Sequence, residues 1–373
     1  MTKLSVVHFH ELENYPPTVN FLRFISGKYH ESISVEVLTI AGTLSPLSFN
    51  KNVKIFRLAR WRSTMTRFAR AWVYLKFNFL AIYRLFRFAP DAILYYETLS
   101  SGPVWLYTKI FRKKTRVFIH YHEYVSTVEY QTGMKLSKWL HQKERHMYPL
   151  VNWISHTNSD RLKLFLADVH PAVSSETHVI PNYPPVSWRR EIKREKRDKL
   201  RFVYVGALNL TTLYFKEMAE FVSRYSSNCE WDIYSFQPAA EVKSYISSLG
   251  TANIHVKPGV PYDSLPAVLR HYDVGLILYK GHIPNYVYNA PNKLFEYHVC
   301  GLDVWFPTVM LGSLPFATRD TYPKIIAVDF EHLERIDLFS MTNRSGLTSK
   351  QYEFECETVF EPLAQKLTNG NSA

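Results

Sequence analysis

The chain has 373 residues, of which 46% are hydrophobic and 21% are charged, and it contains only 13 glycines. This length is sufficient for two domains with separate cores, and the composition excludes collagen-like and disordered chains. The three cysteines, Cys229, Cys300 and Cys356, follow no metal-ligand or redox spacing. We therefore expect no disulfide framework and a reducing, cytoplasmic environment.

The net charge of +12 lies entirely in the first half of the chain. Residues 1–185 contain 24 lysines and arginines against 12 acidic residues, whereas residues 186–373 contain 21 of each. Residues 37–90 contain ten basic residues and no acidic one. Such a field favours a negative partner, which leaves phospholipid headgroups, a phosphorylated acceptor and nucleic acid as candidates.

The first elements predict a parallel α/β domain. Residues 4–9 and 35–40 read as buried strands with a helix at 18–29 between them. Polar residues follow the first strand at once, so we expect no signal peptide. The loop at 10–17 should lie at the carboxyl edge of the sheet, where ligands bind in such folds. His10 and Glu11 are therefore candidate acceptor-binding residues, the alternative being ordinary solvated loop side chains.

Residues 61–88 combine basic and aromatic side chains. Lys76 and Arg84 interrupt the segment too early for a bilayer span, which needs about 20 mostly apolar residues. We expect an amphipathic helix whose residues 73–86 are core and whose N-terminal part is exposed. Three arginines would then face anionic headgroups or another acidic partner: Arg62, Arg67 and Arg70. The alternative is a helix packed on the sheet with solvated charges.

A cluster of polar residues ends another predicted strand. Strands are expected at 92–96 and 115–120, and the second runs into H-Y-H-E-Y at 120–124. His122 can bind a hydroxyl or move a proton, and Glu123 can orient it or act as a base. These two are the candidate catalytic residues. A buried histidine with a purely structural role is the alternative.

A change in composition marks the domain boundary. Alternating charges, R-R-E-I-K-R-E-K-R-D-K, occupy the predicted hinge at residues 186–200. We expect an acceptor-binding domain at 1–185, a donor-binding domain at 201–345, and a C-terminal helix and tail at 346–373.

The second half alternates strands and helices in the pattern of a parallel sheet. Strands are predicted at 201–205, 231–236, 254–257 and 274–279, and helices at 213–225, 239–249 and 264–271. Gly206 follows the first of these strands, where a residue without a side chain lets the backbone approach a phosphate. No G-x-G-x-x-G occurs, which disfavours a dinucleotide enzyme.

The most informative segment is residues 288–307, which read Y-N-A-P-N-K-L-F-E-Y-H-V-C-G-L-D-V-W-F-P. The pattern predicts a helix with Pro291 in its first turn and Gly301 at its end, followed by a strand at 303–306. Lys293 and Glu296 share one face near the helix N-terminus.

This face suits a nucleotide diphosphate. The helix N-terminus and Lys293 favour phosphate, and a carboxylate one turn later can accept two hydrogen bonds from a ribose. An exposed ion pair between residues three apart is the alternative. The candidate donor-binding residues are Gly206, Asn209, Lys280, Asn289, Pro291, Asn292, Lys293 and Glu296.

The segment P-N-K-L-F-E-Y-H-V-C-G-L-D-V resembles the P-x-K-x-x-E-Y-x-x-x-G-x-P-V signature of GT-B glycosyltransferases of the family 4 type. Supporting segments follow in the family's order: V-I-P-N-Y-P at 179–184, F-V-Y-V-G-A-L at 202–208 and V-P-Y-D-S-L-P-A-V-L-R-H-Y-D-V-G-L at 260–276. The resemblance implies an α/β fold of two Rossmann-like domains facing a cleft, with the last helix crossing back to the first domain.

The resemblance also implies the reaction. A retaining glycosyltransferase would move a sugar from a nucleotide-diphosphate donor to a saccharide or lipid-linked acceptor in surface-polysaccharide biosynthesis. No Asp-x-Asp occurs, so we expect neither a metal ion nor a cofactor beyond the nucleotide-sugar substrate. The family's second glutamate, eight positions before the ribose-binding one, is Tyr288 here, so the donor sugar is not implied.

The basic first half predicts an enzyme on the inner face of the cell membrane, held peripherally by anionic lipid. Two alternatives stay open. A GT-B-type sugar-nucleotide epimerase would use the same donor site without an acceptor. A nucleic-acid-binding protein would use the basic stretch, although no nucleic-acid-binding motif is present and its basic residues lie among core-like aromatics.

Overall fold

The computed structural model describes residues 1–42, 46–62, 64–110, 114–169, 175–189, 198–236, 238–343, 345–349 and 353–369. The chain divides into two compact units. Unit 1 comprises Met1–Pro181 and Cys356–Ala373, and unit 2 comprises Asn182–Glu355. Most of the predicted hinge at 186–200 lies outside the described residues, as do residues 350–352 and 370–373 of the predicted C-terminal segment.

Unit 1 contains a seven-stranded parallel sheet in the order β3-β2-β1-β4-β5-β6-β7. This is the strand order of Rossmann sheets with one strand added at the end. The strands are β1 (Thr2–Glu11), β2 (Ile33–Ala41), β3 (Val53–Arg60), β4 (Ala92–Tyr96), β5 (Arg116–Tyr121), β6 (Trp153–His156) and β7 (Thr177–Val179).

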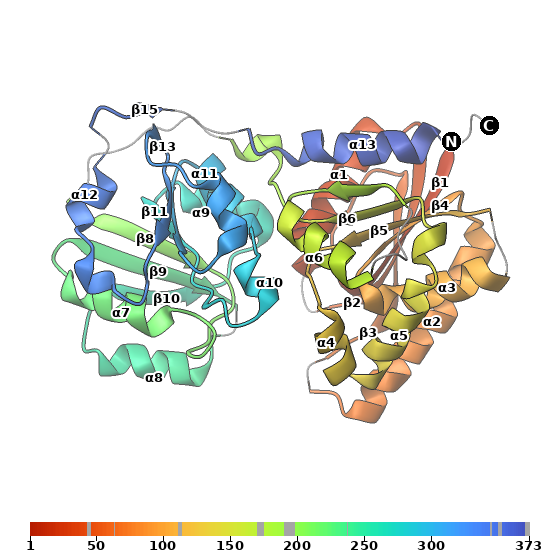
Figure 1. Ribbon diagram of the computed structural model, residues 1–373, viewed down its shortest axis with the longest axis horizontal. Helices are drawn as coiled ribbons and strands as arrows, with labels where there is room; N and C mark the ends of the chain where they lie inside the picture. Colours follow the sequence, from red (N-terminus) through yellow and green to blue (C-terminus); the bar gives the residue numbers. More distant parts are fainter. Residues whose placement is uncertain are drawn as a thin grey trace. The chain divides into compact units, whose positions relative to one another are not determined.

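Helices cover both faces of this sheet. They are α1 (Pro16–Lys28), α2 (Arg67–Phe88), α3 (Ser101–Ile110), α4 (Thr127–Thr132), α5 (Lys135–Arg145), α6 (Ser159–Val169) and α13 (Cys356–Thr368). Figure 1 shows α1 and α13 on one face and α2, α3 and α5 on the other. Right-handed crossovers require this division, because the chain moves in opposite directions along the sheet through α1 and through α2.

The last helix belongs to unit 1, as the resemblance implies. In α13, Glu361 Oε2 lies 2.8 Å from Lys28 Nζ of α1. The Arg116 guanidinium donates to the carbonyl oxygens of Lys366 and Leu367, each at 2.7 Å. These hydrogen bonds satisfy carbonyl groups at the C-terminal end of the helix, which have no partner within it.

The sequence prediction missed strand β3. Its residues read V-K-I-F-R-L-A-R, and only Val53 and Ala59 are buried. Because β3 is an edge strand, much of its surface faces solvent, and its basic residues obscure the apolar alternation that identifies a strand.

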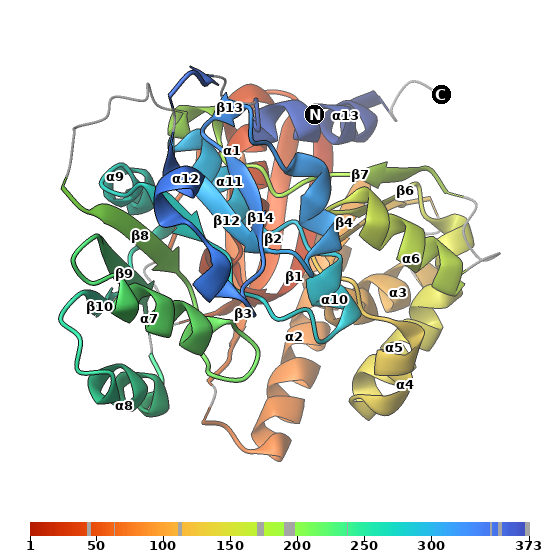
Figure 2. The same ribbon diagram turned by 60° about the vertical axis from the view of Figure 1, so that its left-hand side comes forward.

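The buried and the exposed residues of α2 lie on opposite faces of the helix, not in its two halves. Its buried residues are Val73, Tyr74, Phe77, Ala81 and Leu85, which recur at helical spacing along one side. Large apolar side chains are exposed in both halves of the other side, so the expected division into a core part and an exposed part is wrong. Figure 2 shows the first turns of α2 extending beyond the strands that the helix covers. Among the described residues, no helix combines the length and the apolar character that crossing a membrane requires.

Unit 2 contains a six-stranded parallel sheet in the order β10-β9-β8-β11-β12-β14. The strands are β8 (Leu200–Val205), β9 (Cys229–Ser235), β10 (Ile254–Pro258), β11 (Val274–Leu276), β12 (Asp303–Pro307) and β14 (Ile325–Val328), and a small second sheet pairs β13 (Thr321–Tyr322) with β15 (Thr348–Ser349). The helices are α7 (Phe215–Arg224), α8 (Ala240–Ser248), α9 (Leu265–Leu269), α10 (Pro284–Val287), α11 (Asn292–Val299) and α12 (Leu338–Thr342).

Strand β11 and helix α11 approach each other closely at Gly275. The ring of the buried Tyr297 lies where a side chain at Gly275 would begin. The Tyr297 hydroxyl accepts a hydrogen bond of 3.1 Å from the backbone N–H of Val205 in β8. One tyrosine therefore fixes α11 against two neighbouring strands, and only glycine at position 275 permits the contact.

We predict that Gly275→Ala destabilises the protein by about 1–3 kcal/mol, because the new methyl group must displace a buried ring in a packed interior. Urea or thermal unfolding measures the change. Gly27→Ala is the control, since nothing lies within 4 Å of a methyl group added there in α1. We expect that change to be neutral or to stabilise by up to about 1 kcal/mol. Equal losses in the two variants would contradict the packing argument.

Candidate functional site

The first candidate site lies in unit 2, where Lys293 of α11 approaches the end of β8. A side-chain carbon at Gly206 would lie 3.2 Å from Lys293 Nζ and 3.5 Å from the Tyr204 hydroxyl. Gly206 has φ 147, a conformation that other residues rarely adopt. The sequence predicted that the backbone at Gly206 approaches a phosphate, and the structure places the Lys293 ammonium group beside that backbone.

Aromatic rings surround the Lys293 ammonium group. Its Nζ lies 5.8 Å from the ring centres of both Tyr204 and Tyr279. It makes no ion pair with a carboxylate anywhere in the described part of the chain. Burial acts to lower the Lys293 pKa, but Tyr279, Tyr204 and Glu296 together raise it above its ordinary value. The group therefore carries a positive charge at neutral pH.

Lys280, the other predicted cation, is already paired. Its Nζ lies 2.6 Å from Glu217 Oε1 of α7 and 5.1 Å from the Tyr214 ring centre. A lysine whose charge is balanced by a carboxylate attracts a diphosphate less strongly than Lys293 does. No local pattern predicts this pair, because the two residues are 63 positions apart.

Glu296 is buried one turn after the start of α11. Its Oε1 accepts a hydrogen bond of 2.6 Å from the Asn292 side-chain amide. Burial raises the Glu296 pKa to about 7, while Asn292, Lys293 and Tyr262 act to lower it. The exposed ion pair that was the alternative to a nucleotide site is excluded, since Glu296 is buried and no such pair joins the two described side chains.

The remaining predicted donor-binding residues shape the loops around this helix. Asn209 Oδ1 accepts from the backbone N–H groups of Thr211 and Thr212 at 3.1 and 2.7 Å, which organises the loop after β8. The Asn289 carbonyl accepts a 2.8 Å hydrogen bond from the Ser313 hydroxyl. Pro291 is the residue that caps α11 rather than part of its first turn.

The second candidate site lies in unit 1, at the carboxyl ends of β1, β4 and β5. His122 is buried and stacks on Tyr96, with ring centres 5.0 Å apart. Its Nε2 lies 3.1 Å from the Thr18 hydroxyl of α1. Its carbonyl oxygen accepts a 2.7 Å hydrogen bond from the Arg161 guanidinium. The predicted catalytic histidine is therefore held in one orientation by three elements.

Glu97 is the carboxylate beside His122, and the sequence prediction missed it. Its Oε1 accepts from the backbone N–H groups of His122 and Glu123 at 2.6 and 3.3 Å. Burial, and then the charge of Glu123, raise the Glu97 pKa to about 8, although those two hydrogen bonds act to lower it. Glu97 also has φ 61, a strained value for a residue with a side chain. Strain of this kind concentrates at functional sites.

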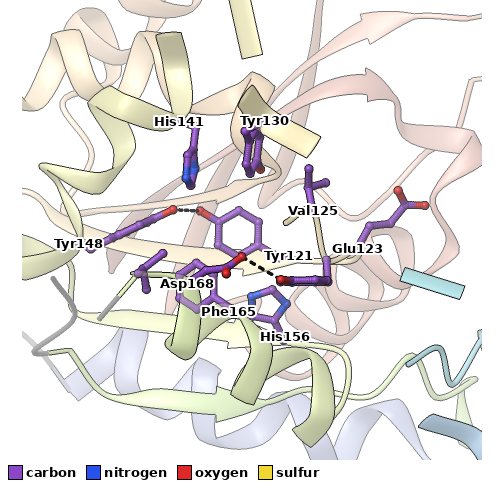
Figure 3. A pocket seen from close by; sticks show the side chains of 11 residues that line it. Tyr121, Glu123, Val125, Tyr130, His141, Tyr148, His156, Phe165 and Asp168 are labelled. Atoms are coloured by element: carbon purple, nitrogen blue, oxygen red, sulfur yellow. Dashed lines mark hydrogen bonds between the residues drawn. The ribbon is translucent and has the colours of Figure 1, made fainter. Parts of the chain in front are cut away.

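The Glu123 side chain is exposed, and Figure 3 shows its carboxylate pointing away from the neighbouring tyrosines and histidines. His10 is half-buried, and its ring lies 5.0 Å from that of Tyr15. Glu11 lies over Gly42 and accepts a 3.0 Å hydrogen bond from Asn14. His10 thus lies near the His122 cluster, whereas Glu11 turns toward the end of β2.

His8 is a second site residue that the sequence prediction missed. It is fully buried, and neither ring nitrogen has a hydrogen-bond partner among the described residues. Its ring centre lies 4.5 Å from Tyr15 and 6.2 Å from His122. Burial, together with His10 and His122, holds the His8 pKa well below its usual value. The signal in the sequence was a histidine inside an otherwise apolar strand.

Unit 1 also contains a buried polar network, in which Glu144 accepts hydrogen bonds of 2.8 Å from Tyr95 and Thr98. The hydroxyls of Tyr121 and Tyr148 lie 3.1 Å apart beside a small cavity, which His156 also lines (Figure 3). This cavity measures about 10 Å³. That is space for about one water molecule, so the network supports the site and does not bind a sugar.

Metal-ligand geometry is absent from the described residues: no three histidine, cysteine, aspartate or glutamate side chains are placed to hold a metal ion.

Comparisons with known proteins identify the fold. No protein-family model matches the sequence, and no curated protein matches it. Solved structures do match over the full length. Sucrose-phosphate synthase from Thermosynechococcus elongatus is similar at a TM-score of 0.68 and 12% identity, over 100% of this chain and 96% of that one.

Two further structures extend this result. The lipopolysaccharide outer core galactosyltransferase WaaB matches at a TM-score of 0.63 and 13% identity, over 98% of this chain and 99% of that one. The UDP-GlcNAc 2-epimerase from Neisseria meningitidis, bound to UDP-GlcNAc, matches at 0.54 and 11%, over the same shares. At these identities the likeness concerns the fold, and it confirms the fold that the sequence resemblance implied. The chain has two Rossmann-like domains of the GT-B type, the fold of glycosyltransferases and of sugar-nucleotide epimerases.

Proposed function

We propose that the protein is a glycosyltransferase that moves a sugar from a nucleotide-diphosphate donor to a saccharide or lipid-linked acceptor. The observation that carries the proposal is the Lys293 ammonium group beside Gly206, with the buried Glu296 on the same short helix. A cation without a carboxylate partner, at a helix N-terminus and next to open backbone, is a site for phosphate. The carboxylate one turn later is placed to accept hydrogen bonds from ribose hydroxyls.

The same groups would assist departure of the nucleotide. Negative charge develops on the diphosphate as the bond to the sugar breaks. Lys293 and the N-terminal N–H groups of α11 would stabilise that charge, with Lys280 as a weaker contributor because of its pair with Glu217. We propose that this arrangement replaces a metal ion and that the sugar keeps its anomeric configuration.

The acceptor would bind unit 1. At the carboxyl edge of its sheet, burial lowers the His8 pKa and raises the Glu97 pKa to about 8, so both side chains favour their uncharged forms, which suits sugar hydroxyls. We propose that His122 binds a hydroxyl or moves a proton, with Glu97 in the supporting role that the sequence prediction gave to Glu123. His8, His10 and Tyr15 would line the same edge.

The exposed residues of helix α2 support the proposal that the protein binds a membrane surface. Six large apolar side chains on one side of it are between 50% and 90% exposed: Phe68, Trp72, Leu75, Phe79, Tyr83 and Phe86. They recur every three or four residues, and the exposed charged residues of the helix are the cations Arg67, Arg70, Lys76 and Arg87. An apolar stripe flanked by cations is the pattern of a helix that lies in a bilayer surface. We propose that the enzyme acts on the cytoplasmic face of the cell membrane in surface-polysaccharide biosynthesis.

An epimerase is the second candidate, because the Neisseria meningitidis enzyme shares the fold. Incubation with nucleotide sugars alone separates the two. An isomerised nucleotide sugar would identify an epimerase, whereas a glycosyltransferase needs an acceptor, or slow hydrolysis, to release the nucleoside diphosphate.

We predict that Lys293 and Glu296 recognise different parts of the nucleotide. Lys293→Met should lower the affinity for nucleoside diphosphates about ten- to a hundredfold, which corresponds to the loss of one charge-assisted hydrogen bond. It should leave binding of the parent nucleoside unchanged, whereas Glu296→Gln should weaken both. Thermal shift and calorimetry with a panel of nucleoside diphosphates measure this, and Lys280→Met is the matched control with a smaller expected effect. Equal losses for nucleoside and diphosphate in Lys293→Met would remove the phosphate assignment.

We also predict a pH dependence that belongs to Glu296. Since its pKa is raised to about 7, a proton competes with the ribose hydroxyls at lower pH. Nucleoside diphosphate affinity should therefore rise between pH 6 and 8 as the carboxylate forms. The phosphate, whose own pKa is about 6, contributes equally in Glu296→Gln, so the difference between the two proteins isolates the carboxyl group. Identical pH profiles would contradict the ribose contact.

For the membrane, we predict that changing Arg62, Arg67 and Arg70 to serine weakens binding to anionic vesicles about a hundredfold, at about 1 kcal/mol for each charge. The control removes three exposed cations from unit 2 with Lys216→Ser, Arg224→Ser and Lys243→Ser. Co-sedimentation measures both. Unchanged sedimentation of the α2 variant, or an equal loss in the control, would count against this surface.

A further inference from the structure

A pocket of about 590 Å³ opens in unit 1 between α3, α5 and the starts of β5 and β6. It is lined by Trp105, Thr108, Lys109, Thr115, Val117, Lys143, His146, Met147, Leu150 and Val151. Thr115 and Val151 come just before β5 and β6, whereas His122 comes just after β5. Because the strands are parallel, the pocket lies at the opposite edge of the sheet from the candidate acceptor site. Its volume is in the range of small-molecule sites.

The charges of this pocket are unbalanced. Lys109 Nζ of α3 and Lys143 Nζ of α5 lie 5.2 and 5.5 Å from the centre of the same Trp105 ring. Neither forms an ion pair with a carboxylate within the described ranges, and the lining contains no acidic residue. The nearby Glu144 is buried in its own network with Tyr95 and Thr98. Two cations therefore lie close to one indole ring with no carboxylate beside them, and a bound anion would balance their charge.

Apart from Thr108, Thr115 and His146, the rest of the lining is apolar, and it continues to the surface. Trp105, Val117, Met147 and Val151 form much of the lining. Leu150 is 80% exposed, and Ile110 and Trp139 on the neighbouring helices are exposed as well. The Trp139 ring lies 6.0 Å from Trp105 and 5.7 Å from Lys143 Nζ. A ligand with an apolar chain could therefore leave the pocket without passing a polar barrier.

We propose that this pocket binds the phosphate-bearing end of an anionic lipid, with the phosphate between Lys109 and Lys143 and the first part of the chain on Trp105 and Leu150. The two cations favour an anion, and the apolar lining favours an apolar chain attached to that anion. A bilayer is the source, because α3 packs against α2 (Figure 1), and α2 carries the exposed apolar stripe. This inference rests on the membrane docking proposed above but not on glycosyl transfer.

Titration with soluble single-chain probes tests the pocket without a bilayer. Octyl phosphate, kept below its aggregation threshold, should bind with saturation and change tryptophan fluorescence, whereas octyl glucoside and inorganic phosphate should each bind more weakly. The double variant Lys109→Gln, Lys143→Gln should bind octyl phosphate about tenfold more weakly, as expected for the loss of two partly exposed charge-assisted contacts. The matched control is Lys51→Gln with Lys54→Gln, which removes two exposed cations beside and within β3 and should have no effect.

Three outcomes would overturn the proposal. The first is equal affinity in the pocket variant and the control. The second is binding of octyl glucoside as tight as that of octyl phosphate, which would indicate an apolar pocket without anion recognition. The third is inorganic phosphate binding as tightly as octyl phosphate, which would indicate an anion site without a lipid chain.

To test the source of the ligand, the pocket variant and the α2 arginine variant are each measured for binding of vesicles and of octyl phosphate. The pocket variant should bind anionic vesicles several-fold more weakly than wild type. The α2 arginine variant should lose vesicle binding and keep full affinity for octyl phosphate. If the pocket variant binds vesicles as wild type does, the bilayer is not the source and the proposal fails. Nucleoside diphosphate binding should be unchanged in the pocket variant, so failure of this inference and failure of the enzyme assignment can be told apart.

Discussion

The structure of unit 2 depends on the close approach of α11 to the sheet at Gly275. A tyrosine ring packed directly on backbone, with its hydroxyl bonded to the neighbouring strand, leaves α11 little freedom to shift. The position of the Lys293 ammonium group follows from this contact, since it lies one helical turn before Tyr297. The surroundings keep this cation charged, since Tyr279, Tyr204 and Glu296 together raise the Lys293 pKa above its ordinary value despite burial. A persistent positive charge of this kind favours an anionic ligand.

The two units present different chemistry at the carboxyl edges of their sheets. In unit 2 the edge holds a persistent positive charge and a carboxyl group whose pKa lies near neutrality. In unit 1 the edge holds His8, whose pKa is lowered by burial, and Glu97, whose pKa is raised. Desolvation therefore favours uncharged groups in unit 1. Neither His8 nor Glu97 offers a positive charge to a phosphate, and the nearby Arg161 guanidinium is already bonded to the His122 carbonyl oxygen, whereas a sugar would find hydrogen-bonding groups. This difference is the physical basis for assigning the nucleotide to unit 2 and the acceptor to unit 1.

The features predictable from sequence were those set by local periodicity. The 3.6-residue repeat placed Lys293 and Glu296 on one short helix, and the strand after Gly301 followed directly. What the sequence could not show depended on pairing between distant segments. Strand β4 pairs with β5 so that Tyr96 lies opposite His120, and this register brings Glu97 to the backbone of His122. Likewise, the pairing of Lys280 with Glu217 requires the tertiary structure. Glu123 is adjacent in sequence to His122, but the chain bends after β5, so the His122 side chain is buried while that of Glu123 is exposed.

Helix α2 shows why its basic residues alone do not identify a partner. Nucleic acid would account for the cations, but its phosphates give no reason to expose six large apolar side chains along one line. A protein partner would account for the apolar stripe, yet the cores of such interfaces are depleted in charge. An anionic bilayer accounts for both at once, because apolar rings enter the acyl boundary while arginines at the flanks reach the headgroups. The proposed membrane surface would therefore account for much of the excess of positive charge in the first half of the chain, where no acidic residue lies between 37 and 90.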